Sequence, residues 1–182
     1  LANQQFAKNL MVSLEARRIR PEQTSLTIFS VSEEMDKTMQ SCADSYGYGS
    51  VLSINEPEMV ARMLTRSYPP YQTMRFDQDG NAVTDFHGLI IGFGQIGQAV
   101  LRQLLMNSQF YGSSSKIAVF APDYEQRMGW LCHECREMLQ HYRISMFPYD
   151  GRSRQLYDYL EDHAGSIQYV AICAGSESVN AE

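Results

Sequence analysis

Hydrophobic residues alternate along the chain between two kinds of pattern. Short apolar or β-branched runs, typical of buried strands, are followed by segments whose apolar residues recur every three or four positions, as on the buried side of a helix. The runs predict strands at 25–31, 50–54, 87–92, 116–121, 143–148 and 167–173. The helical spacing predicts helices at 3–18, after Ser32, after Asn55, and at 96–106, 123–141 and 153–163.

This order of elements predicts an α/β fold, a Rossmann-like, doubly wound and mainly parallel sheet with an N-terminal helix and α/β segment. We expect residues 25–54 and 86–173 to contribute strands to one continuous sheet of about six strands. Asp79-Gly80 lies between two short alternating stretches, which is a hairpin signal. The predicted regions are a half-Rossmann-like segment at 1–71, a hairpin or linker at 72–85, and a nucleotide-binding domain at 86–182, expected to be truncated.

A glycine-rich loop follows the strand predicted at 87–92. It consists of Gly92, Phe93, Gly94, Gln95, Ile96 and Gly97. In a dinucleotide-binding loop of this spacing, the first glycine permits the turn, the second lets the backbone approach the pyrophosphate, and the third lets helix and strand pack closely. The N-terminus of the following helix favours a phosphate. The loop therefore predicts a nucleotide site, although a turn that binds nothing would have the same spacing.

The residue that would hold the ribose is expected at the end of the next strand. That tip is Ala121, and the first acid after it is Asp123. Asp123 either reaches the ribose or caps the helix that follows. Without an acid at the tip, repulsion of a 2′-phosphate is relaxed and Arg127 is placed to attract one. NADP is therefore a candidate cofactor beside NAD.

Charge and composition narrow the classes of function. The formal net charge of −6 argues against a nucleic-acid partner, which requires a basic face. The longest apolar run, 88–94, is too short to span a bilayer. Cys132 and Cys135 have the spacing of half a zinc site, but a second pair of ligands is missing from the sequence, so no metal is expected.

Catalytic motifs are absent from the sequence. It contains no Tyr-x-x-x-Lys pair and no Gly-x-Ser-x-Gly, and no Lys-Ser/Thr follows the glycine loop. We interpret the histidines as solvated or helix-capping residues, and none is predicted beside the loop. The histidines are His87, His133, His141 and His163.

Four stretches in order, "FHGLIIGFGQIGQAVLRQLL", "KIAVFAPDYEQR", "RISMFPYDGRS" and "YVAICAGSESVN", resemble the TrkA-N (KTN, or RCK) nucleotide-binding domains that regulate potassium channels and transporters. The resemblance covers about 86–182. It implies that the glycine loop binds a phosphate and that an acid after the second strand binds a ribose. It also implies that an Asp after the third strand lies near the adenine. The residues carried over, besides the loop, are Asp123, Asp150, Ala174, Gly175 and Asn180. Ala121 and Tyr149 depart from the pattern of the family.

The resemblance implies a regulatory module that binds NAD or NADP, or ATP, ADP or AMP, in the cytoplasm. It also implies a homo-oligomer and, in a longer protein, a membrane channel or transporter as partner. The chain lacks a starting Met, so we expect it to be a fragment. Part of an NAD(P)-dependent oxidoreductase and a non-binding structural unit are the alternatives. Candidate aromatic residues for self-association are Tyr68, Tyr71, Phe110 and Tyr111.

Overall fold

The computed structural model describes residues 25–30, 50–134 and 141–175, together with five positions between 37 and 48. The helix predicted at 3–18, Cys135 and Asn180 lie outside the described residues. The chain divides into two compact units, Leu1–Val60 and Ala61–Glu182. Each unit is described by itself.

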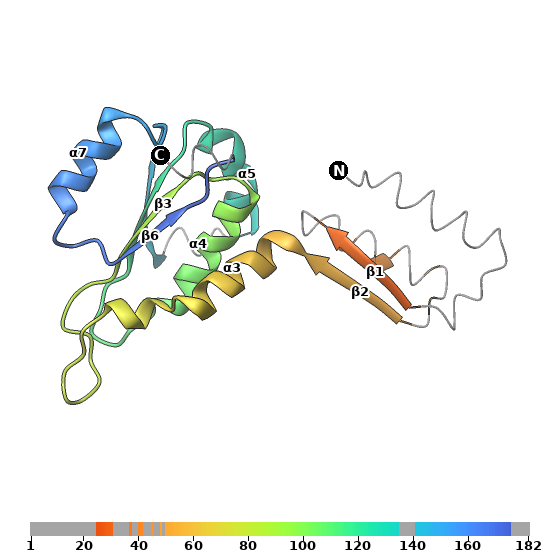
Figure 1. Ribbon diagram of the computed structural model, residues 1–182, viewed down its shortest axis with the longest axis horizontal. Helices are drawn as coiled ribbons and strands as arrows, with labels where there is room; N and C mark the ends of the chain where they lie inside the picture. Colours follow the sequence, from red (N-terminus) through yellow and green to blue (C-terminus); the bar gives the residue numbers. More distant parts are fainter. Residues whose placement is uncertain are drawn as a thin grey trace. The chain divides into compact units, whose positions relative to one another are not determined.

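In the first unit, β1 (Ser25–Ser30) and β2 (Ser50–Asn55) pair in parallel, with Leu26 opposite Val51 (Figure 1). The parallel pairing of these two strands is confirmed. They form a two-stranded sheet of their own, so the prediction of one continuous six-stranded sheet is wrong. An apolar run indicates that a strand is buried, but it does not specify which distant strand it pairs with.

Helix α3 (Glu56–Ser67) begins where the sequence predicts a helix after Asn55. The Asn55 side chain accepts a hydrogen bond from the backbone N–H of Glu58 at 3.1 Å, which is a helix cap. Glu56 and Glu58 in the first turn suit the positive end of the helix dipole.

The second unit contains a four-stranded, all-parallel sheet in the order β5-β4-β3-β6. Its strands are β3 (His87–Ile91), β4 (Lys116–Phe120), β5 (Arg143–Phe147) and β6 (Tyr169–Ile172). The connecting helices are α4 (Gln95–Asn107), α5 (Tyr124–Glu134) and α7 (Arg154–His163). The chain steps outward from β3 to β5 and then returns to the other side of β3, which is the Rossmann-like strand order.

Helices cover both faces of this sheet. Buried residues of α4, with side chains from α3 and α5, pack on the face that carries Ile90 and Val119. Helix α7 covers the opposite face, where Leu156 packs with Leu89 and Phe120 (Figure 1). After β5 the chain returns across the sheet to add β6 on the other side of β3. Because connections between parallel strands are right-handed, this change of direction places α7 on the second face. The doubly wound α/β prediction is confirmed for this unit.

A short 3-10 helix, η2 (Pro70–Thr73), and a small turn precede β3. Phe76 and Ala82 form an antiparallel bridge, and Gly80 at the turn has a φ of 83°. The Asp77 carboxylate accepts the backbone N–H groups of Asp79 and Asn81 at 3.0 and 2.8 Å. The turn therefore forms at Asp79-Gly80, as the hairpin signal predicts.

His87, at the start of β3, is neither solvated nor a helix cap, which corrects the sequence interpretation. The side chain is 1% exposed. Its Nε2 lies 2.7 Å from the Tyr159 hydroxyl and its Nδ1 lies 3.1 Å from Ser166 Oγ. Burial, together with the charges of Lys116 and His163, lowers the pKa of His87 to about 4.

This pKa predicts a loss of stability in mild acid. The unfolded chain, with a histidine pKa of 6.5, binds the proton more tightly than the folded chain. The stability that the neutral His87 side chain contributes is present above the unfolded pKa of 6.5 and is lost as the pH falls toward the folded pKa of about 4. We expect the free energy of unfolding to fall by about 2 kcal/mol between about pH 7 and pH 5, at about 1.36 kcal/mol per pKa unit.

Urea unfolding of the wild type and a His87→Gln variant at both pH values measures this loss. The variant is expected to show a smaller pH dependence. His141→Gln, at an exposed histidine, is the matched control and should keep the wild-type dependence. Equal pH dependence in all three proteins would contradict the prediction.

Candidate functional site

The candidate site residues that the structure describes lie at one edge of the four-stranded sheet. Parallel strands end at the same edge, so the loops that follow β3, β4, β5 and β6 meet there. Hydrogen bonds continue past the strand ends: the Gly92 N–H donates to Phe120 O at 2.8 Å, and the Cys173 N–H to Ile91 O at 2.7 Å. The glycine loop thus leaves β3 at the point where the strand order reverses.

Two of the three glycines are required by the backbone. Gly92 has a φ of 96°, which side chains rarely tolerate, and a Cβ there would lie 2.5 Å from the carbonyl oxygen of Cys173. A Cβ at Gly97 would overlap the carbonyl oxygen of Gly92. The first glycine therefore makes the turn against β6, and the third lets α4 approach the end of β3.

Gly94 has neither of these roles. Its φ of −68° and ψ of −170° are open to any residue, and a Cβ there would meet nothing within 4 Å. It is the N-cap residue of α4, so the first N–H groups of the helix receive no hydrogen bond from a side chain at this position. A ligand with a phosphate can approach the backbone here.

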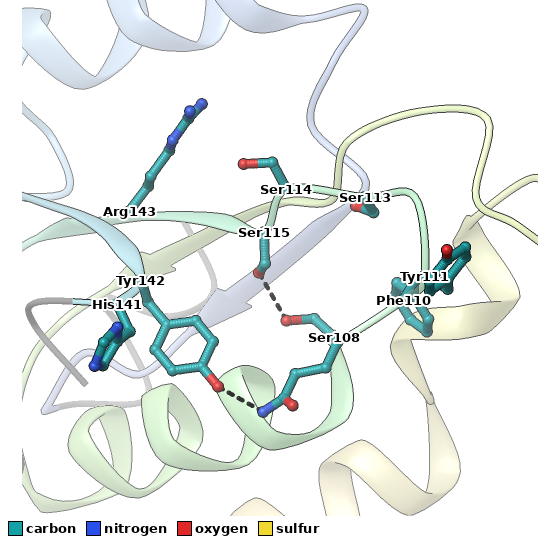
Figure 2. Close-up of a pocket in the computed structure, with 10 residues that line it drawn as sticks. Ser108, Phe110, Tyr111, Ser113, Ser114, Ser115, His141, Tyr142 and Arg143 are labelled. Atoms are coloured by element: carbon teal, nitrogen blue, oxygen red, sulfur yellow. Dashed lines mark hydrogen bonds between the residues drawn. The ribbon is translucent and has the colours of Figure 1, made fainter. Parts of the chain in front are cut away.

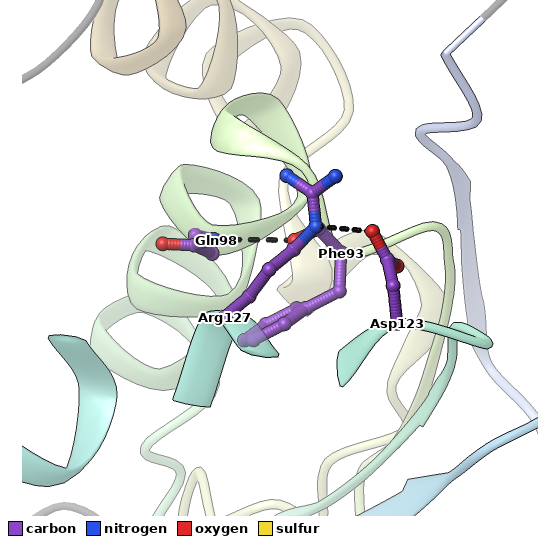
Figure 3. A network of polar contacts seen from close by, with 4 residues as sticks. All are labelled: Phe93, Gln98, Asp123 and Arg127. Atoms are coloured by element: carbon purple, nitrogen blue, oxygen red, sulfur yellow. Dashed lines mark hydrogen bonds and ion pairs between the residues drawn. The ribbon is translucent and has the colours of Figure 1, made fainter. Parts of the chain in front are cut away.

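The rest of the loop is held from within. The Gln98 side chain donates to the carbonyl oxygen of Phe93 at 3.2 Å (Figure 3). Phe93 is 1% exposed, so only its backbone is available to a ligand. Gln95 and Ile96 are exposed on the first turn of α4.

Asp123 and Arg127 lie together after β4. Arg127 Nε donates to the Asp123 carboxylate at 2.6 Å, and both side chains are partly exposed (Figure 3). The ion pair joins the acid proposed for the ribose and the cation proposed for a 2′-phosphate. Ala121, at the strand tip, is 1% exposed and belongs to the apolar core. A carboxylate at that position would be buried among apolar side chains, which explains why the nearest acid stands two residues later.

Asp150 and the residues after β6 complete the edge. The Asp150 carboxylate accepts the backbone N–H of Arg152 at 2.8 Å in a tight turn before α7. A Cβ at Gly151 would lie 2.9 Å from Ile91 Cγ2, so this turn reaches the end of β3. Ala174 is half-buried and Gly175 is exposed.

The sequence interpretation missed Cys173. This residue follows β6 directly and packs under the glycine loop, where its Cβ would lie 3.5 Å from a Cβ at Gly97. Burial raises the pKa of its thiol to about 11, so the thiol is protonated at neutral pH. Its place one residue before Ala174, at the end of a predicted strand, is the signal that would have found it.

The described residues offer no group of three side chains suited to a metal ion. No helix in the described ranges is both long and apolar enough to cross a bilayer. Comparisons with protein-family models, curated proteins and solved structures found no match to this chain. The function is therefore inferred from the site itself.

Proposed function

We propose that residues 86–182 form a regulatory module that binds NAD or NADP, or another adenine nucleotide, at the glycine loop. The observation that carries this proposal is the open space at Gly94. It lies at the switch point of a parallel sheet, where nucleotides bind in Rossmann-like folds. The nucleotide phosphates would lie against the backbone of Gly94 and the N-terminus of α4.

Gly94 also favours this proposal over a purely structural turn. The turn and the helix packing account for Gly92 and Gly97, whereas at position 94 the N-cap of α4 gives no reason why the residue must be glycine rather than another capping residue. A binding loop supplies the reason, because any side chain there would occupy the space of the pyrophosphate.

The positions of the histidines favour a regulatory role over an oxidoreductase. His87 starts β3, His141 precedes β5 and His163 ends α7, so three of the four histidines lie at the sheet edge opposite the glycine loop, and the fourth, His133, is in the last turn of α5. A general base would have to reach a substrate beside the bound nucleotide. The link to a potassium channel or transporter rests on the TrkA-N resemblance of the sequence motifs.

Calorimetric titration of the protein with NAD, NADH, NADP, ATP and AMP tests the proposal. We expect saturable binding of at least one of these nucleotides. Binding of none of them at millimolar concentration would rule out the nucleotide module for this chain.

Asp123→Ala is expected to weaken nucleotide binding by about 1–3 kcal/mol if the carboxylate accepts a ribose hydroxyl, a charge-assisted hydrogen bond. The exposed Asp123–Arg127 pair contributes little to folding, so stability should change little. Arg127→Ala should lower the affinity for NADP relative to NAD, because the guanidinium would accompany the 2′-phosphate. Calorimetry on both variants decides: unchanged affinities would show that the pair only caps the start of α5.

We also propose that the module self-associates. Tyr68, Tyr71 and Tyr111 are 65%, 56% and 83% exposed. Phe110, by contrast, packs against the core and makes edge contacts with Phe76 and Phe86 at 5.5 and 6.3 Å, so it is not a surface candidate. Sedimentation velocity is expected to show dimers or larger species at micromolar concentration, reduced in Tyr111→Ser. A monomer at high micromolar concentration would oppose self-association of this chain.

A further inference from the structure

Helix α7 has a small apolar contact with the sheet that it covers. Of its residues, Leu156 is buried, and Tyr159 and Leu160 are partly buried against the same apolar cluster. Helix α4, on the other face, buries seven residues. A segment with few buried apolar contacts opens at a lower free-energy cost than the rest of a domain. The attachment of α7 therefore depends strongly on its polar contacts.

A polar cluster joins the C-terminal half of α7 to the start of β3. We define it as His87, Tyr159, His163 and Ser166. The Tyr159 ring stacks on the His163 ring with a centroid distance of 4.1 Å, and the His163 ring lies 5.3 Å from the His87 ring. Beside them, the neutral side chain of Gln168 accepts the backbone N–H of His87 at 2.7 Å.

The hydrogen bonds of this cluster determine where the imidazole of His87 carries its proton. The Ser166 hydroxyl donates to the carbonyl oxygen of His163 at 3.1 Å, so toward Nδ1 of His87 it can only accept. Nδ1 therefore carries the proton, and Nε2 accepts the hydroxyl proton of Tyr159. Both ring nitrogens of His87 are thus bonded to α7 or to the turn that follows it.

A second proton on His87 would break the bond that Tyr159 donates. Nε2 would become a donor, and the hydroxyl proton of Tyr159 would have to turn away from it. The rings of Phe120 and Phe147 pack on the Tyr159 ring at centroid distances of 5.2 and 5.4 Å and offer no oxygen or nitrogen acceptor. Protonation therefore costs a hydrogen bond between α7 and the sheet.

The charges around His87 also oppose a second proton. Lys116 is the register partner of His87 on β4, and Arg143 is the register partner of Lys116 on β5. Figure 2 shows the Arg143 side chain on the side of the strands away from Tyr142. This is the face of Phe147, which α7 covers, because every second residue of a strand lies on the same face. An imidazolium at position 87 would start a row of three cations.

The nearby carboxylates are engaged elsewhere or exposed. Asp85 accepts the backbone N–H of Ser114 at 2.7 Å, and Glu161 and Asp162 are exposed on α7. Burial and the neighbouring positive charges therefore act together to lower the pKa of His87 to about 4.

We propose that α7 is a pH-dependent cover, which protonation of His87 releases from the sheet while the rest of the second unit stays folded. In the open state His87 contacts water and loses its cationic neighbour on α7. The apolar face that carries Leu89 and Phe120 is then uncovered. This local opening is distinct from the global loss of stability in acid, because the packing of α4 is kept.

Amide hydrogen exchange at pH 7 and pH 5, in low concentrations of urea and corrected for intrinsic exchange rates, tests this opening. Amides of α4 report global unfolding, so their opening constant should rise steeply with urea. We expect α7 amides to have an opening constant at least about tenfold larger, with little dependence on urea. It should rise about twentyfold from pH 7 to pH 5, as linkage to pKa values of 6.5 and about 4 requires.

His87→Gln removes the titrating group and should abolish the pH dependence of α7 opening. His141→Gln, at an exposed histidine, is the matched control and should keep it. Circular dichroism verifies the fold of both variants. A titration of the His87 imidazole by NMR in the wild type gives a second measurement, which decides if His87→Gln does not fold.

Three results would each overturn the proposal. The first is an equal opening constant and urea dependence for α7 and α4 amides, which would mean that α7 opens only in global unfolding. The second is a twentyfold rise that persists in His87→Gln. The third is a His87 imidazole that titrates in the wild type at the ordinary pKa of 6.5.

Discussion

Gly97→Ala is expected to lower the free energy of unfolding by about 3 kcal/mol or more. The added Cβ would overlap the carbonyl oxygen of Gly92, which is a backbone atom at the end of β3. No side-chain rotation can relieve this contact, so α4 would have to move away from the sheet that it covers. Helix α4 supplies buried residues such as Leu101 and Leu104 to the main core, so that movement disrupts packing well beyond the loop.

Urea unfolding followed by circular dichroism measures this effect. Gly94→Ala is the matched control, because it adds the same methyl group three residues earlier where nothing lies within 4 Å. Its expected cost is about 1 kcal/mol or less, from the weaker helix cap alone. Similar losses in the two variants would show that the Gly97 contact relaxes easily and that the tight packing is not needed.

Local order in the second unit could be predicted from the sequence. All four strands and helices α4 and α7 of this unit lie within a few residues of their predicted ranges, because buried strands and amphipathic helices leave different hydrophobic periods. Helix α5 begins at Tyr124, one residue after the predicted start, and positions 135–140 of its predicted range lie outside the described residues. The parallel order of the strands alone predicts that the glycine loop, Asp123 and Asp150 lie at the same edge of the sheet, because each follows the end of a strand. The sequence pattern was sufficient for these features.

Long-range pairing could not be predicted in the same way. The apolar runs of β1 and β2 resemble those of β3 and β4, yet the two pairs belong to separate sheets. His87 is a second example, since its burial depends on Tyr159 and Ser166, more than seventy residues away in the sequence. Phe110 is a third, because its partners Phe76 and Phe86 come from the hairpin region and the start of β3. Contacts of this kind depend on how the elements are packed.

The glycine loop was predicted from the sequence only in part. The spacing of the three glycines predicts a tight turn between strand and helix, and the structure places the turn there. The spacing does not reveal which glycines the fold itself requires. Only the surroundings of each glycine separate Gly92 and Gly97, which contact backbone, from Gly94, which faces open space.

Gly94→Val is therefore expected to abolish nucleotide binding while the fold is kept. The isopropyl group would fill the space where the pyrophosphate must approach the backbone, and the affinity should fall at least about a hundredfold, or about 2.8 kcal/mol at about 1.4 kcal/mol per tenfold change. The backbone of Gly94 already has angles that valine can adopt. Calorimetric titration with the nucleotide that binds the wild type most tightly measures the loss.

Gly165→Val is the matched control for this variant. Gly165 also has no atom within 4 Å of an added Cβ, but it follows α7 at the opposite edge of the sheet. Its variant should bind the nucleotide as the wild type does. If Gly94→Val keeps wild-type affinity, the ligand does not use the loop, and the glycine at position 94 serves no binding function. If both variants lose affinity, the loss comes from a general effect of valine on the fold, and the open space at Gly94 no longer supports a phosphate site.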